Sequence, residues 1–230
     1  MNKILAVVAH PDDEVIGLGG TLLKHTRSGD EVAVLILGDG KSSRFKKYKK
    51  LGNQVQTLSL AETKAALRLL HVKKFWKESL PDNRFDRLEQ IEIAKIISSY
   101  VSRWQSTIVY THHYGDLNID HRMTAEGVLI ACRPIENSVV KSIYLFETLS
   151  STEMSGYNPH RAFLPNMFVD ISAELPTKLR AMSSYKSELH DFPHPRSLAA
   201  IEYNARLWGA KNNIDAAEAF FCVRDIKSTL

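Results

Sequence analysis

The strongest constraint on the fold of this chain is an apolar run that ends abruptly in a polar cluster. Residues 3–9 read KILAVVA, and residues 10–14 read HPDDE. A short, continuous apolar run with β-branched residues is typical of a β-strand that is covered on both faces. Such a strand needs packing layers on both sides of a sheet, so the run indicates an α/β protein with charged groups where its first strand ends.

Strand-like and helix-like segments then alternate as far as Phe146. We expect strands at 31–37, 73–76, 107–110 and 142–146, and helices at 15–29, 57–70, 85–104 and 122–132. This alternation predicts parallel βαβ units in an open, doubly wound, mostly parallel sheet. Because crossover connections are right-handed, the expected strand order is 3-2-1-4-5.

The C-terminal part of the chain is expected to form an appendage to that sheet. Residues 178–189 and 196–208 carry helical patterns, and a proline-containing break at 190–195 separates them. The sequence contains no linker, repeat or low-complexity segment. We therefore expect a single domain over residues 1–230, with an α/β sheet and a C-terminal helical or strand appendage.

Polar residues follow the first and the fourth expected strands. The segment 10–14 comes after the first strand, and the segment 112–121 comes after the fourth. In open α/β sheets, ligands bind at the carboxyl ends of the strands, where the strand order reverses. In the expected order this point lies between the first and fourth strands, so two segments that are distant in sequence should form one site.

Three residues of these clusters form a candidate metal site. His10 and Asp13 lie three positions apart, and His121 would come from the second cluster. A catalytic zinc ion typically has three nitrogen or oxygen ligands and one position open for water. We therefore expect one Zn²⁺ per chain, with Asp12 as the general base that accepts a proton from the attacking water.

Neighbouring polar residues have a supporting role in this hypothesis, and each has a simpler explanation. Asp120 is expected to support a histidine ligand, and Glu14 could do the same or favour a helix N-terminus. Asp12 and Asp13 could instead be helix-capping or first-turn acids, and His121 could be structural. Capping does not explain a histidine directly after a buried strand.

Composition narrows the class of protein further. No apolar run approaches the roughly 18 residues of a membrane span. No signal-peptide core develops, because the apolar run 4–9 is short and is followed at once by charged residues. Cys132 and Cys222 stand in unrelated contexts, which argues against a disulfide framework and for a reducing compartment. We expect a soluble cytoplasmic protein.

The net charge of +4 is mild, and much of it comes from the run 41–50, KSSRFKKYKK. This run could be a solvated loop or helix face. Alternatively, it could be a rim that attracts an anionic substrate, for instance a phosphorylated or nucleotide-linked one. Nucleic-acid binding would need a broader basic surface or a known motif, and neither is present in the sequence.

Two segments carry a resemblance to a known family. Residues 9–20 (AHPDDEVIGLGG) and 111–122 (THHYGDLNIDHR) resemble the LmbE-like, or PIG-L, family of zinc-dependent N-acetylglucosaminyl deacetylases. Weaker similarity extends over most of the chain, at 61–72, 80–86, 146–153, 185–198 and 217–220. The resemblance implies a Rossmann-like fold and an enzyme that hydrolyses a linear amide, releasing acetate from an N-acetylated amino sugar or its conjugate.

The site residues that the resemblance implies agree with the chemical hypothesis. His10, Asp13 and His121 would be the zinc ligands, and Asp12 would be the general base. Many relatives have a histidine three positions before the last ligand, where this chain has Asn118. An asparagine could donate a hydrogen bond to the oxyanion but could not act as the acid.

The protonation and substrate-binding roles therefore need other candidates. His113 or His194 could protonate the leaving amine, and His194 is expected near the substrate. Many relatives also carry a sugar-binding arginine in the region where this chain has Leu58–Ser59. Arg44 or Arg84 could take its place.

Other functions and assemblies also have some support in the sequence. Residues 17–20 (GLGG) could suggest a Rossmann-type nucleotide binder, but the spacing is not G-x-G-x-x-G and the glycines come late after the strand. A non-catalytic metal-binding protein is a further alternative. Apolar and aromatic residues near the C-terminus could serve a homo-oligomer interface or cover the sheet of their own subunit. These residues are Phe192, Trp208, Phe220 and Phe221.

Overall fold

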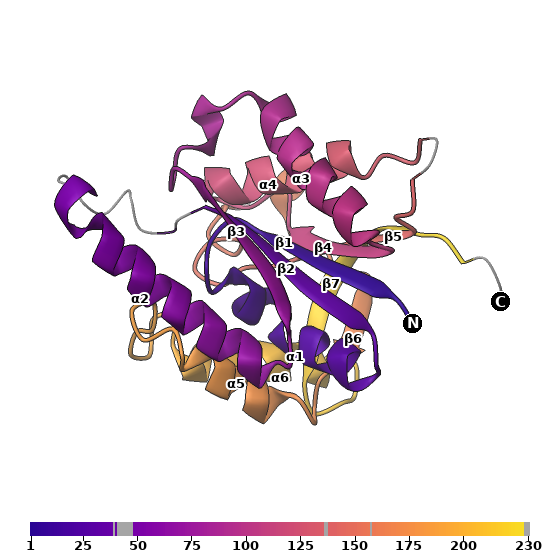
Figure 1. Ribbon diagram of the computed structural model, residues 1–230. Helices are drawn as coiled ribbons and strands as arrows, with labels where there is room; N and C mark the ends of the chain where they lie inside the picture. Colours follow the sequence, from indigo (N-terminus) through magenta and orange to yellow (C-terminus); the bar gives the residue numbers. More distant parts are fainter. Residues whose placement is uncertain (39, 41–47, 136–137, 157, 228–230) are drawn as a thin grey trace.

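The chain folds into a seven-stranded sheet with helices on both faces (Figure 1). The computed structural model describes residues 1–38, 40, 48–135, 138–156 and 158–227. The strands are β1 (Lys3–Val8), β2 (Glu31–Gly38), β3 (Lys74–Leu80), β4 (Ile108–His112), β5 (Ser142–Phe146), β6 (Met167–Asp170) and β7 (Ala217–Asp225). The α-helices are α1 (Asp13–Arg27), α2 (Tyr48–Leu69), α3 (Gln90–Trp104), α4 (Ile119–Ala131), α5 (Leu175–Met182) and α6 (Leu198–Ala210). Short 3₁₀ helices occupy η2 (Phe85–Arg87) and η3 (Pro159–Arg161).

The sheet confirms the expected strand order and extends it. Its order is β3-β2-β1-β4-β5-β7-β6, and the first five strands pair in parallel. Strand β7 pairs antiparallel with β5, and β6 pairs antiparallel with β7. The C-terminal part of the chain therefore contributes two strands to the same sheet, beside the helices α5 and α6.

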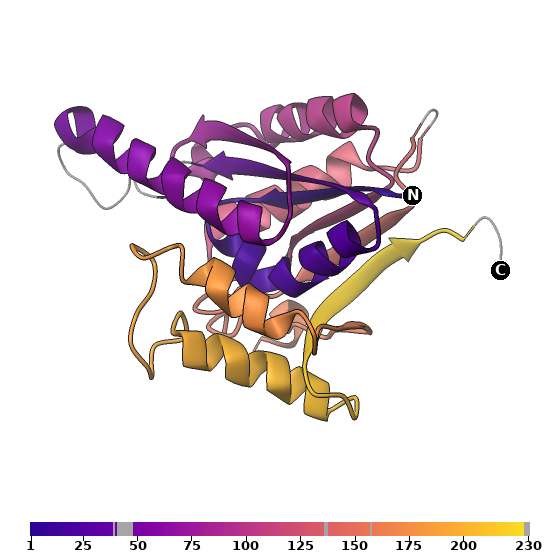
Figure 2. The ribbon, with the colours of Figure 1, turned by 60° about the horizontal axis from the view of Figure 1, so that its bottom comes forward.

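The two faces of β1 show why its sequence is apolar throughout. Ile4, Ala6 and Val8 pack in one core with residues of α1, α2, α5 and α6, whereas Leu5 and Val7 pack in the other core with α3 and α4. Figure 2 shows α5 and α6 side by side below the sheet. Among the described residues, no helix has both the length and the apolar character needed to cross a membrane.

The prediction of one helix over 85–104 is wrong at its start. Residues 85–87 form a single 3₁₀ turn, Leu88 is extended, and α3 begins at Gln90. The Phe85 ring is fully buried, and its backbone N–H donates to Asp120 Oδ1 at 3.0 Å. This tertiary anchor holds the backbone in a loop although the local pattern is compatible with a helix.

Two other helix bounds also differ from the expectation. The helix expected over 178–189 runs from Leu175 to Met182, because the following residues turn to bury Tyr185. The helix expected over 57–70 begins at Tyr48, earlier than its apolar spacing indicated.

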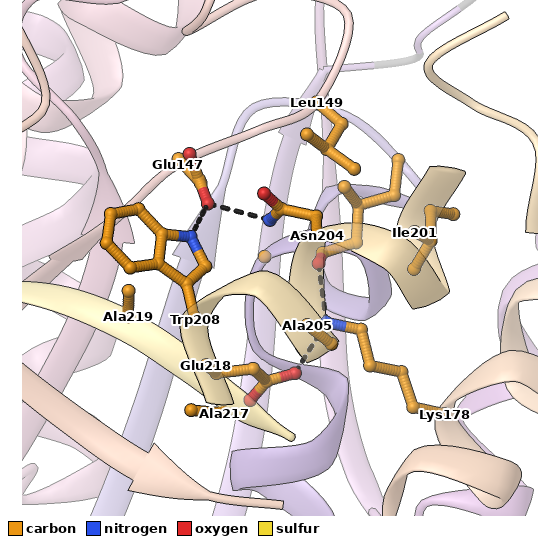
Figure 3. Close-up of a pocket in the computed structure, with 12 residues that line it drawn as sticks. Glu147, Leu149, Lys178, Ile201, Asn204, Ala205, Trp208, Ala217, Glu218 and Ala219 are labelled. Carbon is orange, nitrogen blue, oxygen red and sulfur yellow. Dashed lines mark hydrogen bonds and ion pairs between the residues drawn. The ribbon is translucent and has the colours of Figure 1, made fainter. Parts of the chain in front are cut away.

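Helix α1 is kinked at Leu18, where the backbone leaves the helical region (φ −148°). The kink frees backbone groups, and a buried ion pair from the C-terminal part of the chain satisfies them. Lys178 Nζ donates to the Ile16 carbonyl at 2.8 Å. Glu218 accepts from the backbone N–H groups of Gly20 and Thr21. Lys178 and Glu218 also pair directly at 2.6 Å (Figure 3). The cavity beside them is about 10 Å³, too small for a sugar.

Gly17 is needed because β5 approaches α1 closely. A Cβ at Gly17 would lie 2.1 Å from Phe146 Cδ2, whereas a Cβ at Gly19 would have its nearest neighbour, Val15 Cγ1, at 3.3 Å. We expect Gly17→Ala to lower the free energy of unfolding by about 1–3 kcal/mol through overpacking. Gly19→Ala, the matched control, should lower the free energy of unfolding clearly less. Equal melting temperatures for the two variants would contradict this account.

Candidate active site

The two predicted polar clusters meet at the carboxyl ends of β1 and β4. His10 follows β1, Asp13 begins α1, and His121 lies in the first turn of α4. All three residues are buried, and one potential ligand atom from each lies within 4.8 Å of the others. Residues more than 100 positions apart in the sequence therefore form one compact group of nitrogen and oxygen donors.

The Asp13 carboxylate lies at the centre of this group. Its Oδ2 atom accepts the His10 backbone N–H at 2.8 Å and lies 3.6 Å from His10 Nδ1 and 3.5 Å from His121 Nε2. Within the described part of the chain, Asp13 Oδ1 and both ring nitrogens of His121 lack a hydrogen bond of normal geometry. Buried polar atoms without partners are costly. A cation held by His10, Asp13 and His121 would satisfy them, so the donor set fits a metal ion.

A second carboxylate faces the outer nitrogen of each histidine. Asp120 Oδ2 lies 2.9 Å from His10 Nε2, and Asp116 Oδ1 lies 3.2 Å from His121 Nδ1. Asp120 is itself fixed by the backbone N–H groups of Asn83 and Phe85. Carboxylates in this position orient metal-binding histidines and raise their basicity. Asp120 therefore lies beside His10, and its supporting role stays a prediction.

The electrostatics of the site favour a bound positive charge. Burial by itself would lower the pKa of His10, but the Asp120 and Asp82 carboxylates raise it to about 10. Likewise, burial would lower the pKa of His121, but Asp13 and Asp116 raise it to about 9. Burial would raise the pKa of Asp13, yet the surrounding histidines hold it below its usual range. The carboxylates therefore stabilise a cation at this position, whether it is a proton or a metal ion.

Asp12 has an unusual conformation for the start of a helix. Its backbone is left-handed (φ 103°), and its side chain makes no capping hydrogen bond to α1. Such strain in a residue other than glycine often marks a functional site. The side chain is 1% exposed, and Asp12 Oδ2 lies 3.2 Å from a guanidinium nitrogen of Arg196. Burial raises the pKa of Asp12, and Arg196 opposes that shift.

His112 and Asp82 also lie in this site, and the sequence hypothesis did not include them. His112 stacks on His121 with ring centroids 4.0 Å apart, and its Nε2 accepts the Ala9 backbone N–H at 2.9 Å. This nitrogen is therefore not available to a metal ion. Burial lowers the pKa of His112 to about 3, so the ring is neutral. Asp82 Oδ1 lies 3.2 Å from His10 Nε2.

Strand periodicity was the signal that could have identified His112. Tyr110, two residues earlier in β4, packs in the core that contains α1. Side chains two apart on a strand face the same side of the sheet, so the position of His112 on that face could be predicted. No comparable pattern pointed to Asp82, which follows β3 in a loop.

The candidates for oxyanion binding and protonation have other contacts in the structure. The His113 ring nitrogen Nε2 donates to the Arg161 carbonyl at 2.9 Å, and the ring packs edge-on against Phe163. Asn118 is the N-cap of α4, and its Oδ1 accepts the Asp120 backbone N–H at 2.8 Å. Its amide nitrogen is the group that a substrate oxygen would use. Both catalytic roles stay predictions.

Of the three candidate substrate-binding residues, Arg84 and His194 lie in the described part of the chain. Arg84 is exposed and lies two residues after Asp82. His194 accepts the backbone N–H of Arg196 at 3.0 Å and stacks on His190. Arg44 and the side chains of the basic run 46–50 lie outside the residues that the structure describes.

Comparison with known proteins gives one family and several relatives. The model of the family "GlcNAc-PI de-N-acetylase" (PIG-L) matches residues 5–132. Diacetylchitobiose deacetylase of Thermococcus kodakarensis is 33% identical over 198 residues, which cover 82% of this chain and 70% of that protein.

Two solved structures resemble this fold and have different named activities. N,N'-diacetylchitobiose deacetylase from Pyrococcus horikoshii has a TM-score of 0.78 and 23% identity, over 97% of this chain and 84% of that one. GalB from Pseudomonas putida, a 4-carboxy-2-hydroxymuconate hydratase, has a TM-score of 0.76 and 20% identity over the full length of both chains. The fold is therefore found with more than one reaction.

Metal binding should release protons at neutral pH. In the metal-free protein, His10 and His121 have pKa values of about 10 and about 9, so both are protonated at pH 7. A metal ion binds only the neutral rings, so we expect Zn²⁺ binding to release about two protons per ion. The apparent affinity should rise as the pH increases from 7 towards 9. Calorimetric titration in buffers of different ionisation enthalpy measures this number, and binding without proton release would refute the assignment.

The stacked pair His112 and His121 offers a matched test of the ligand set. We expect His121→Ala to lose zinc, because two ligands from the first cluster alone would hold the ion poorly. We expect His112→Ala to retain zinc and lower the melting temperature, since the Ala9 N–H would lose its buried acceptor at a cost of about 1–3 kcal/mol. Zinc content and melting temperature are measured on the same preparations. Zinc at one equivalent in His121→Ala would exclude the three-ligand site.

Proposed function

The chain belongs to the GlcNAc-PI de-N-acetylase (PIG-L) family, and from this membership we propose that it is a zinc-dependent deacetylase of N-acetylated amino sugars or their conjugates. The observation that carries the proposal is the pairing of a buried His10–Asp13–His121 donor set with the strained, buried carboxylate of Asp12. A metal site and a neighbouring base are the two parts that metal-assisted hydrolysis of an amide requires.

The proposed mechanism assigns the proton transfers to Asp12. When bound, a zinc ion would polarise the acetyl carbonyl and acidify the attacking water. Asp12 accepts the proton of that water as the new C–O bond forms. A carboxylate beside the attacking water can take and hold this proton. In place of His113 and His194, we assign to the same carboxyl the return of the proton to the amine nitrogen as the C–N bond breaks. Water and amide then give acetate, a free amine and one proton.

The oxyanion needs hydrogen-bond donors in addition to the ion. We assign this role to the amide nitrogen of Asn118, whose oxygen is already engaged at the N-terminus of α4. His113 is the alternative donor, although its Nε2 proton is directed to the Arg161 carbonyl.

The substrate is proposed to be an acetamido sugar. The family description names GlcNAc-PI, and the Thermococcus relative acts by its name on diacetylchitobiose, so N-acetylglucosamine is the shared unit. Exposed Arg84 and the basic run 46–50 would favour an acceptor that carries a negative charge.

The geometry disfavours the nucleotide-binding alternative. The N–H groups of Gly20 and Thr21 already bind the Glu218 carboxylate, so a phosphate there would meet a buried negative charge. Gly17 is explained by its contact with Phe146. A non-catalytic metal-binding protein would have no need of a strained, buried Asp12 next to its ligands.

Changing Asp12 to Asn tests the proposed role directly. Asn keeps the shape of the side chain but cannot accept the proton, so we expect kcat to fall about 100- to 10,000-fold with zinc still bound. Acetate release from N,N'-diacetylchitobiose and N-acetylglucosamine, together with zinc content, gives the measurement. Asp86→Asn, which changes an exposed acid in η2, is the matched control and should keep full activity. Loss of zinc from Asp12→Asn would make this residue a ligand and not the base.

A further inference from the structure

We propose that Tyr185 and Arg196, two residues of the segment 183–197, position the general base Asp12. We call this segment the clamp segment. It lies between α5 and α6, and the PIG-L family match ends well before it, at residue 132. The inference rests on the proposed function, because it takes Asp12 as the base. Tyr185 supports the backbone of Asp12 through Glu14, and Arg196 lies beside the carboxylate of Asp12.

Arg196 holds the carboxylate of Asp12. One guanidinium nitrogen lies 3.2 Å from Asp12 Oδ2 and 3.3 Å from Glu188 Oε2, and Nε donates to Ser150 Oγ at 2.9 Å. The Arg196 side chain is only 16% exposed. A planar guanidinium that is hydrogen-bonded to Glu188 and Ser150 has little rotational freedom, so its charge has a fixed position beside the carboxylate of Asp12.

The contact leaves the base able to work. Asp12 Oδ2 has no hydrogen bond of normal geometry among the described residues, although Arg196 is within ion-pair distance. The arginine therefore supplies positive charge beside the carboxylate without occupying Oδ2 with a hydrogen bond of normal geometry. This arrangement is what a positioning residue requires.

The clamp segment has anchors that do not involve Asp12. The Arg196 backbone N–H donates to His194 Nδ1, and its carbonyl accepts from the His190 N–H at 3.4 Å. Ser187 donates to the Glu62 carboxylate from both its N–H and its hydroxyl, at 3.1 and 2.8 Å, which ties the segment to α2. The segment is thus held in place by the body of the protein and can act as a support.

Tyr185 holds the backbone of Asp12 through Glu14. The Tyr185 ring is fully buried, and its hydroxyl donates to one oxygen of Glu14. The other oxygen of Glu14 accepts the Asp12 N–H at 3.1 Å. This N–H belongs to the residue with φ 103°, and a strained backbone of this kind persists only where its surroundings determine it. Glu14 thereby links the clamp segment to the conformation of Asp12.

Steady-state kinetics of Arg196 variants test the inference. We expect Arg196→Ala to lower kcat about 100-fold, the cost of a reacting group misplaced by about 1 Å, with little change in KM. The kcat of Arg196→Lys should lie between those of Arg196→Ala and the wild type, because lysine keeps the charge but loses the planar geometry. Guanidinium in solution should restore part of the kcat of Arg196→Ala. The matched control is Arg206→Ala, an exposed arginine of α6 paired with Glu202, and it should keep wild-type kinetics.

Tyr185→Phe removes only the hydroxyl and leaves the buried ring. We expect it to lower kcat by about 10-fold with zinc content unchanged. If both Arg196→Ala and Tyr185→Phe fold, bind zinc and keep the wild-type kcat, the inference is wrong. A fall in melting temperature with unchanged kcat would likewise show that the clamp segment is only structural.

A double-mutant cycle provides a readout that does not depend on catalysis. If Arg196 holds Asp12, the effects of Asp12→Asn and Arg196→Ala on the free energy of unfolding should be non-additive. Additive effects would overturn the contact, and with it the inference. Wild-type protein that binds zinc but releases no acetate from any N-acetyl sugar would instead refute the proposed function, while the cycle would still decide whether the two side chains are coupled.

Discussion

The buried carboxylate of Asp13 is the central charge at the carboxyl ends of β1 and β4, and the surrounding histidines are arranged around it. Its Oδ2 atom lies within 3.6 Å of His10, His112 and His121, which come from the carboxyl ends of β1 and β4 and from the start of α4. A carboxylate without water around it is stable only beside positive charge or strong donors. The parallel sheet makes this possible, because neighbouring strands deliver their following residues to the same edge.

The histidines around Asp13 differ in the groups that their second ring nitrogens face. His10 and His121 face carboxylates on that side, so their other nitrogens can serve a cation. His112 uses Nε2 to accept from Ala9 and its other ring nitrogen to meet Thr148, so it is a neutral spacer. The buried carboxylates beside His10 and His121 favour a bound positive charge at this position.

The C-terminal part of the chain completes both the sheet and the site. It adds β6 and β7 to one edge, and its Lys178–Glu218 pair satisfies the backbone groups freed by the kink of α1. From the same part of the chain, Arg196 reaches the carboxylate of Asp12. Strands β2, β3 and β4 and the candidate metal ligands His10, Asp13 and His121 lie within the segment matched by the family model, whereas the support of the proposed base comes from outside it.

The sequence by itself determined the strand order and the meeting of the two polar clusters, because apolar periodicity and crossover handedness are local properties that act the same way in any chain. It also placed His10, Asp13 and His121 in one group, since the two polar segments that carry them come after β1 and β4. Tertiary structure alone decided that residues 85–87 leave the helix, that His112 is a spacer, and that Arg196 faces Asp12. These outcomes depend on contacts such as Phe85 with Asp120, which lie far apart in sequence and follow from packing geometry. Sequence spacing does not predict which partner a buried polar group binds, because that partner comes from a distant segment that only tertiary packing brings close.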